Sequence, residues 1–315
     1  TSIGSSSFYG CSSLTSITLP SSITIIDDNA FEDCILLSEK NIPSSVEKIG
    51  SSVFELCKSL VKITIPSSVI SINNWSFSDC ISLEQITISD SVLIFGSYIF
   101  NGCIKLKEIK LPKLITKIDN GTFSECIELS HIEIPLSVTK IGIDAFSKCS
   151  LLKEIIIPSS VIEIEQSAFY YCTSLEKILI PSSVKSIGCG CFKNCVKLKE
   201  ITIPSSLTII NDSTFQGCSS LDQIEIPSSV ALIGSNAFSD CSSLTMISIP
   251  SSVDKIKNYS FFNCSSMNEI SILSQKISIG FNAFKCCTSL KKILVHSSVD
   301  LCQSGICSHT RIEII

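Results

Sequence analysis

A period of 23 residues runs through almost the whole sequence. Counting from Cys11 in steps of 23, all 13 positions through Cys287 are cysteine, and phenylalanine stands three residues before each one, from Phe8 to Phe284. A period kept this long without an insertion is typical of a solenoid, in which each repeat packs only against its neighbours. We therefore expect residues 1–315 to form a single solenoid domain of about 13 repeats.

Each repeat carries two short strand patterns separated by a turn. After each cysteine, apolar residues alternate with variable ones, which predicts a strand of period two, and a proline such as Pro135 ends it because proline has no N–H to donate. A Ser-Ser pair then predicts a polar turn before a second, shorter strand. In residues 126–148 the side chains expected to point inward are Cys126, Leu129, Ile132, Ile134, Val138, Ile141, Ala145 and Phe146.

The rest of each repeat must return the chain to the next first strand. A glycine such as Gly188 follows the second strand, and we expect it to permit a sharp bend or a positive φ. The segment around the phenylalanine is too short for a helix, so we expect a 3₁₀ turn or a tight arc. Ordering the backbone costs about 1–2 kcal/mol per residue, so one repeat cannot fold alone and stacking must supply the stability.

Thirteen of the 18 cysteines occupy the repeated slot. Stacked slots lie about 4.8 Å apart in such a fold, which is close enough in principle for disulfides. An odd number of slots would leave one thiol unpaired, and disulfides would draw every second pair of repeats closer together. We therefore expect reduced thiols that pack inward as small hydrophobic side chains. Cys286, Cys302 and Cys307 lie outside this series and could form bridges in an exported protein.

The frame departs from the pattern at a few places. It begins partway through a repeat, at Ile3 and Gly4, so we expect a longer parent chain. Lys40 stands where other repeats have the isoleucine of the first strand. Thr310 replaces the next expected cysteine, and we expect residues 297–315 to be a degenerate C-terminal cap with a closing strand after a shortened arc.

Charge and hydropathy exclude two classes of partner. The net charge is −5, and Lys and Arg are interspersed among Asp and Glu without the basic stripe that nucleic-acid binding requires. The apolar residues are spread periodically, and no run approaches the roughly 18 apolar residues of a membrane helix. We therefore expect no nucleic-acid partner and no membrane span in this segment.

The motif Cys-x-x-Leu-x-x-Ile-x-Ile-Pro-x-Ser-Val-x-x-Ile-Gly-x-x-Ala-Phe covers residues 3 to about 300 and resembles the BspA-like class of leucine-rich repeats. The resemblance implies a mainly β, right-handed solenoid, with a parallel β-sheet on a concave face and short strands or 3₁₀ turns on the convex side. It also implies a surface protein of host-associated bacteria or protists, which adheres to host cells, extracellular-matrix proteins or other microbes. No catalytic residue comes with this family.

Residues outside the scaffold give little support for catalysis. His131, His296 and His309 lie in different repeats, and a general base needs an acid or a nucleophile held beside it. Cys189 and Cys191 form an isolated pair without the second pair that a structural zinc site needs. We expect neither an enzyme nor a metal site, and no cofactor.

The variable residues of the first strands should point out from the sheet and stack into columns. Ile156 and Leu179 are apolar in a mostly polar column, with the opposite charges of Glu154 and Lys177 beside them. An apolar centre with a charged rim is typical of interface hot spots, although tolerated surface apolar residues beside an ordinary ion pair would look the same. The predicted ligand-binding residues are Glu108, Lys110, His131, Glu133, Glu154, Ile156, Lys177, Leu179, Glu200 and Thr202.

These patterns favour a non-catalytic module that binds a protein ligand. The resemblance places it at the cell surface or in the secreted fraction, bound to a host or matrix protein, and the alternative is a cytoplasmic scaffold or regulatory protein. Exposed aromatic residues of the arc would lie on the opposite side, either as a second contact surface or as cover for the phenylalanines. They are Trp75, Tyr98, Tyr170, Tyr171 and Tyr259.

Overall fold

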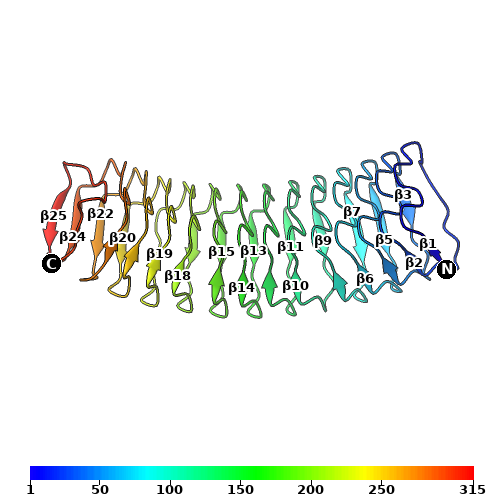
Figure 1. Cartoon of the computed structure of the whole chain (residues 1–315), viewed down its shortest axis with the longest axis horizontal. Coiled ribbons are helices and arrows are strands. Elements are labelled where there is room, and N and C mark those ends of the chain that lie inside the picture. Colours follow the sequence, from blue (N-terminus) through cyan, green and yellow to red (C-terminus); the bar gives the residue numbers. More distant parts are fainter. The chain divides into compact units, whose positions relative to one another are not determined.

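The computed structural model describes the backbone of residues 1–315 and every side chain except those of Glu39 and Lys40. The predicted deviation at Lys40 therefore lies outside the described side chains. Parallel strands joined by turns stack into a mainly β solenoid, which confirms the predicted fold class (Figure 1). Within the described residues, no helix has the length and apolar character needed to cross a membrane.

The chain divides into two compact units, Thr1–Ser160 and Val161–Ile315. Within each unit, every 23-residue repeat forms one coil. The single domain over residues 1–315 stays a prediction.

In most coils a longer strand lies on one side of the unit, here called the strand face. In strands such as Lys62–Ile65 and Gln85–Ile88 buried isoleucines alternate with exposed residues, as the period of two predicted, whereas Ile312 and Ile314 of the last strand are exposed. The first unit contains β3 (Glu39–Asn41), β5 (Lys62–Ile65), β7 (Gln85–Ile88), β9 (Glu108–Lys110), β11 (His131–Glu133) and β13 (Glu154–Ile156). The second contains β15 (Lys177–Leu179), β17 (Glu200–Thr202), β20 (Met246–Ile249), β22 (Glu269–Ile272), β24 (Lys292–Val295) and β25 (Arg311–Ile314).

A second row of two-residue strands follows the Pro-Ser-Ser turns. In the first unit it comprises β1 (Ser2–Ile3), β2 (Ile25–Ile26), β4 (Lys48–Ile49), β6 (Ser71–Ile72), β8 (Ile94–Phe95), β10 (Lys117–Ile118) and β12 (Lys140–Ile141). In the second unit it comprises β14 (Glu163–Ile164), β16 (Ser186–Ile187), β18 (Ile209–Ile210), β19 (Leu232–Ile233), β21 (Lys255–Ile256) and β23 (Ser278–Ile279).

Strand pairing keeps the sequence period until the last coil. Partners lie 23 residues apart, as Ile63 and Ile86 do in β5 and β7. The exception is β25, in which Arg311 pairs with Lys292 at an offset of 19 residues. The closing strand after a shortened arc was therefore predicted correctly.

The core contains a continuous stack of phenylalanines in each unit. Neighbouring rings are nearly parallel, with centroids 5.1–5.7 Å apart, and the rings from Phe31 onward are fully buried. This separation lies in the favourable range for offset aromatic stacking. Each ring is covered by the ring of the next coil, so the stack exists only when coils assemble.

The repeated cysteines are buried free thiols, except Cys11, which is exposed. They also have a bonding role that the sequence did not reveal, because the Sγ atoms from Cys34 to Cys149 and from Cys195 to Cys287 each donate to the carbonyl of the phenylalanine 26 residues earlier. The Cys126 Sγ, for example, lies 3.1 Å from the Phe100 oxygen. Burial raises the pKa of thiols such as Cys80, Cys126 and Cys195, to about 12 in Cys195, so these thiols stay protonated and able to donate. The pKa of Cys287 is instead lowered, chiefly by a hydrogen bond with the Cys264 thiol.

The arc around each phenylalanine is a series of tight turns, which agrees with the second of the two predicted alternatives. Two residues per arc have positive φ, two positions before and two positions after the phenylalanine. Tyr98 and Gly102 flank Phe100 in this way, with φ of 56° and 70°. Most of these positions are occupied by residues other than glycine, which adopt the left-handed region of φ and ψ only rarely.

The positive φ predicted as one of two roles for the glycine after the second strand was wrong. Gly188 is absent from the residues with positive φ. Instead, a Cβ on this glycine would lie 2.2 Å from the Gln166 backbone nitrogen of the preceding coil. The glycine is needed for close approach of two backbones, and it recurs only in alternate coils, at residues 4, 50, 96, 142, 188, 234 and 280.

Candidate functional site

All ten predicted ligand-binding residues are exposed on the strand face. They alternate with the buried side chains of Ile109, Ile132, Ile155, Ile178 and Ile201, which places them on the solvent side of the strands. Ile156 is 82% exposed and Leu179 is 62% exposed. They belong to different units, so their predicted adjacency stays a prediction.

In the first unit, β9 and β11 bring four predicted residues into register. Glu108 pairs with His131 and Lys110 pairs with Glu133. The second of these pairs combines opposite charges on neighbouring strands, an arrangement that favours the observed register.

In the second unit, β15 and β17 bring Lys177 beside Glu200 and Leu179 beside Thr202. The Lys177 Nζ lies 2.6 Å from a Glu200 carboxylate oxygen. The hydrogen bond and positive charge of Lys177 lower the pKa of the Glu200 carboxyl. Glu200 is therefore an ionised side chain whose charge is already neutralised by its neighbour.

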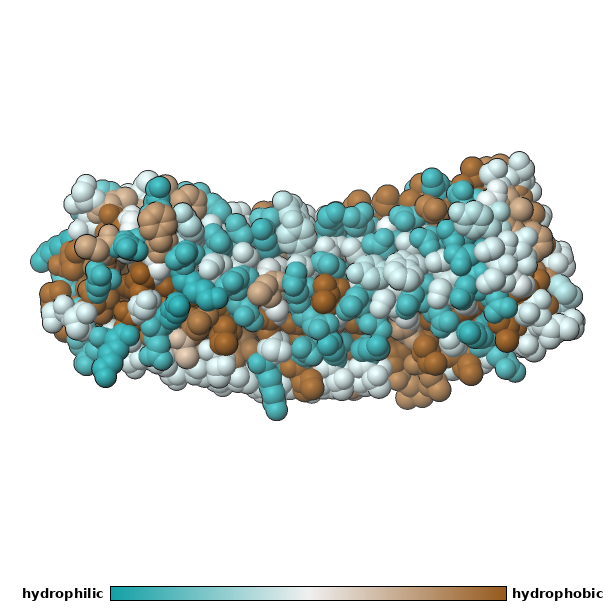
Figure 2. All heavy atoms as spheres, in the orientation of Figure 1, coloured by the Kyte–Doolittle hydropathy of each residue, from teal (hydrophilic) through white to brown (hydrophobic). Residues whose placement is uncertain are grey.

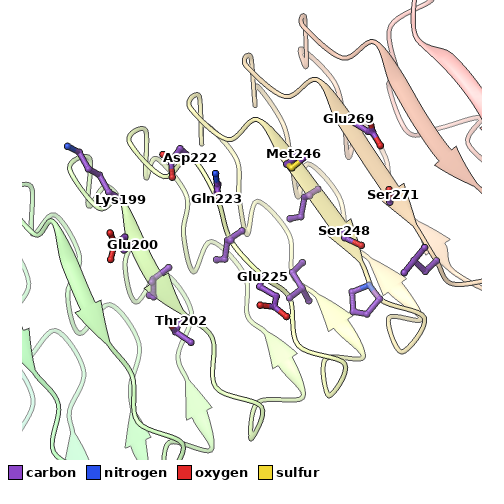
Figure 3. Close-up of a pocket in the computed structure, with 16 residues that line it drawn as sticks. Lys199, Glu200, Thr202, Asp222, Gln223, Glu225, Met246, Ser248, Glu269 and Ser271 are labelled. Carbon is purple, nitrogen blue, oxygen red and sulfur yellow. The ribbon is translucent and has the colours of Figure 1, made fainter.

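A depression of about 880 Å³ opens on the strand face of the second unit, and Glu200 and Thr202 form part of its lining (Figure 3). Its rim carries Asp222 and Glu225 from one coil and Glu269 from β22, two coils further along (Figure 3). Apolar side chains that line it include Ile224, Met246 and Leu273.

The depression lies where the row of strands is interrupted. Residues 221–227 form no strand between β17 and β20, and Figure 3 shows a ribbon without an arrow there. In the part of the chain that the structure describes, no backbone hydrogen bond joins residues 223–226 to either neighbouring coil. Before and after this segment the same coil is hydrogen-bonded to its neighbours. The Thr245 N–H donates to the Asp222 carbonyl at 3.3 Å, and the Ala231 N–H donates to the Thr208 carbonyl at 2.8 Å.

Of the ten predicted residues, the structure brings only Glu200 and Thr202 to this depression. A partial signal for the others is present in the sequence, because Met246 and Glu269 continue the column of Glu200 and Gln223 at steps of 23. No signal marks the interruption itself. Gln85-Ile86-Thr87 has nearly the same sequence as Gln223-Ile224-Glu225 and forms a strand.

Two other surfaces carry exposed apolar groups. On the arc, the rings of Trp75 and Tyr98 stack with centroids 5.8 Å apart. The edge of the first unit at β6 and β8 exposes Ile70, Leu93 and Ile94, and Figure 2 shows hydrophobic side chains grouped along this edge.

The cysteines outside the repeated slot are free as well, including Cys286, Cys302 and Cys307, so the bridges considered for an exported protein are not formed. Cys189 is exposed whereas its neighbour Cys191 is buried. Among the residues that the structure describes, no group of three or more His, Cys, Asp or Glu side chains could hold a metal ion.

Comparison with known proteins agrees with this architecture. No curated protein matches the chain. A leucine-rich repeat protein of Bacteroides ovatus is 36% identical, with a TM-score of 0.86 over 100% of this chain and 87% of its own. A leucine-rich cell surface protein of Faecalibacterium prausnitzii is 34% identical, with a TM-score of 0.57 over 82% of this chain and 79% of its own.

The pneumococcal vaccine antigen PcpA shares the fold at 22% identity, with a TM-score of 0.58 over 93% of this chain and 71% of its own. The model of the BspA-type leucine-rich repeat region matches in six copies, over residues 1–105, 71–199 and 185–313. The chain belongs to the BspA-type leucine-rich repeat family.

Proposed function

We propose that this chain is a non-catalytic protein-binding module of a cell-surface, adhesin-like protein, and that its strand face holds a host-cell or extracellular-matrix protein. The observation that carries the proposal is that each unit exposes a large apolar side chain, Ile156 in the first and Leu179 in the second, on a strand whose other outward residue is charged. Apolar side chains of this size with charged neighbours are the groups that lose most water when a protein partner covers them.

Two further observations support this role. The recurring residues are committed to the core, which leaves the variable residues of the strand face free to differ from coil to coil. A similar protein, that of Faecalibacterium prausnitzii, is described as a cell surface protein. The alternative is an intracellular scaffold, which would use the same face for a cytoplasmic partner.

The binding face is tested by replacing Ile156 and Leu179 with Asp and measuring adhesion of the purified protein to host cells and to immobilised matrix proteins. The matched control replaces Thr64 and Thr87, which occupy the equivalent slot of β5 and β7, with Asp. Loss of adhesion in the first variant alone supports the proposal. Unchanged adhesion by a folded Ile156→Asp, Leu179→Asp variant removes this site from consideration.

The location is tested by labelling intact cells of the source organism with a reagent that does not cross membranes. Labelled protein supports a surface role. Protein that labels only after lysis favours the intracellular scaffold.

A further inference from the structure

The interrupted segment of the second unit leaves backbone groups unpaired. Strand N–H and C=O groups point in the plane of the sheet toward the neighbouring strands. At residues 223–225 they find no backbone partner within the described chain, although such groups are normally paired. They are therefore open to water or to the polar groups of a ligand that enters the depression.

The side chains around the gap have an excess of negative charge, although Lys292 of β24 is in register with Glu269. Asp222, Glu225 and Glu269 make no ion pair within the described residues, whereas Glu200 is already paired with Lys177. Lys199 is the one basic side chain in the described lining. Three carboxylates against one ammonium group favour a cationic ligand.

The floor between the carboxylates is apolar. Ile224 is half-buried, whereas the equivalent isoleucines of its neighbours, Ile201 and Ile247, are buried. Met246 is 58% exposed and Leu273 is 44% exposed, so apolar surface continues to the rim. Lys and Arg side chains suit such a surface, because their aliphatic stems cover apolar groups while the charged ends reach carboxylates.

We propose that this depression binds a short, extended segment of a partner protein in which Lys or Arg alternates with apolar residues. The basic side chains would reach Asp222, Glu225 and Glu269, the apolar side chains would cover Ile224 and Met246, and the bound peptide would shield the unpaired backbone groups of residues 223–225 from water. The volume of about 880 Å³ lies within the roughly 300–1,000 Å³ of ordinary ligand sites. The inference rests on the proposed protein-binding function and names the chemistry of one ligand segment.

The test uses a fluorescein-labelled peptide of alternating Lys and Val, with a peptide of alternating Glu and Val as the charge-reversed probe. Fluorescence anisotropy measures binding to the full chain and to a Glu225→Thr, Glu269→Gln variant. These replacements occur in the same slots of other coils, as Thr202 and Gln223, so the variant should fold. We expect about tenfold weaker binding of the basic peptide, because two partly exposed ion pairs are removed.

The matched control carries Glu176→Gln and Asp254→Asn, which remove the same charge from exposed positions outside the depression. It should bind the basic peptide as the unmodified chain does. Amide hydrogen exchange at residues 223–225 should be fast in the free protein and slower with the peptide bound.

Failure of the basic peptide to bind, equal weakening in the control variant, or unchanged exchange at residues 223–225 would each overturn the proposal. The probe is synthetic, so such a failure concerns this depression alone. Failure of the proposed protein-binding function would appear separately, because the unmodified chain would then not adhere to host cells or matrix proteins.

Discussion

The Oδ1 atom of Asn74 accepts a 2.8 Å hydrogen bond from the backbone N–H of Ser97 in the next coil. The bond is possible because Gly96 has no side chain, since a Cβ there would lie 2.6 Å from both the backbone N and the Oδ1 of Asn74. The same contact recurs in alternate coils between Asp28 and Ser51, Asn120 and Ile143, Asp212 and Ser235, and Asn258 and Phe281.

Replacing Asn74 with Ala should lower the free energy of unfolding by about 1 kcal/mol, because the Ser97 N–H loses its acceptor. Asn74→Asp should retain most of the stability, since Asp28 and Asp212 make the equivalent bond. Urea denaturation of both variants measures the difference. Equal losses in the two variants would show that this hydrogen bond does not stabilise the coil.

Replacing Gly96 with Ala should cost more, about 2–3 kcal/mol, because the new methyl group meets backbone atoms that cannot move aside cheaply. The control is Asn73→Ala, at the same slot of the preceding coil, where a side chain is already present. It should cost much less by the same denaturation measurement. A Gly96→Ala variant as stable as the control would contradict the close approach.

Alkylation should distinguish the cysteines by position. In the native protein, iodoacetamide at mildly alkaline pH should modify Cys11, Cys189 and Cys302, which are exposed. Cys195 should not react, because it is buried and its raised pKa of about 12 keeps the thiol protonated. Mass spectrometry identifies the modified residues, and unfolding in urea should expose all 18. Equal native rates at Cys195 and Cys189 would contradict the buried position of the thiol.

Replacing Lys177 with Met should raise the pKa of the Glu200 carboxyl toward its ordinary value, because it removes the hydrogen bond and the charge that lower it. A lowered folded-state pKa means that the ion pair contributes above the unfolded-state pKa and is lost as the pH falls through the folded-state value. NMR titration of Glu200 follows the change. Lys185→Met, at another exposed lysine of the same unit, should leave the pKa of Glu200 where it is.

The scaffold was predictable because it depends on residues repeated at fixed spacing. Phe123 and Cys126 are buried where their slots predicted, and the strands alternate as Ile132 and Ile134 indicated. The positive φ predicted for Gly188 was wrong because a glycine can be required by a neighbouring backbone as well as by its own φ. The requirement for glycine comes from the backbone of the preceding coil. The sequence of a single repeat therefore does not indicate it.

The candidate site was less predictable for a related reason. The exposure of Ile156 and Leu179 follows from strand alternation, so the sequence was sufficient for it. The interruption at residues 223–225 depends on how closely three successive coils approach one another. The local sequence of this segment matches that of paired strands, so the opening is a property of the stack.

Coils with a glycine at the slot of Gly96 alternate with coils that have a side chain at that slot, such as Asn73. This alternation limits how such an array can change in length. Removing 46 residues leaves each close backbone approach with a glycine beneath it, whereas removing the 23 residues of one glycine-bearing coil brings two coils with side chains at that slot into contact. Shortened variants that differ by whole pairs should therefore fold, and those that lose a single glycine-bearing coil should carry a defect at the junction. The unit of growth for this protein is thus two repeats.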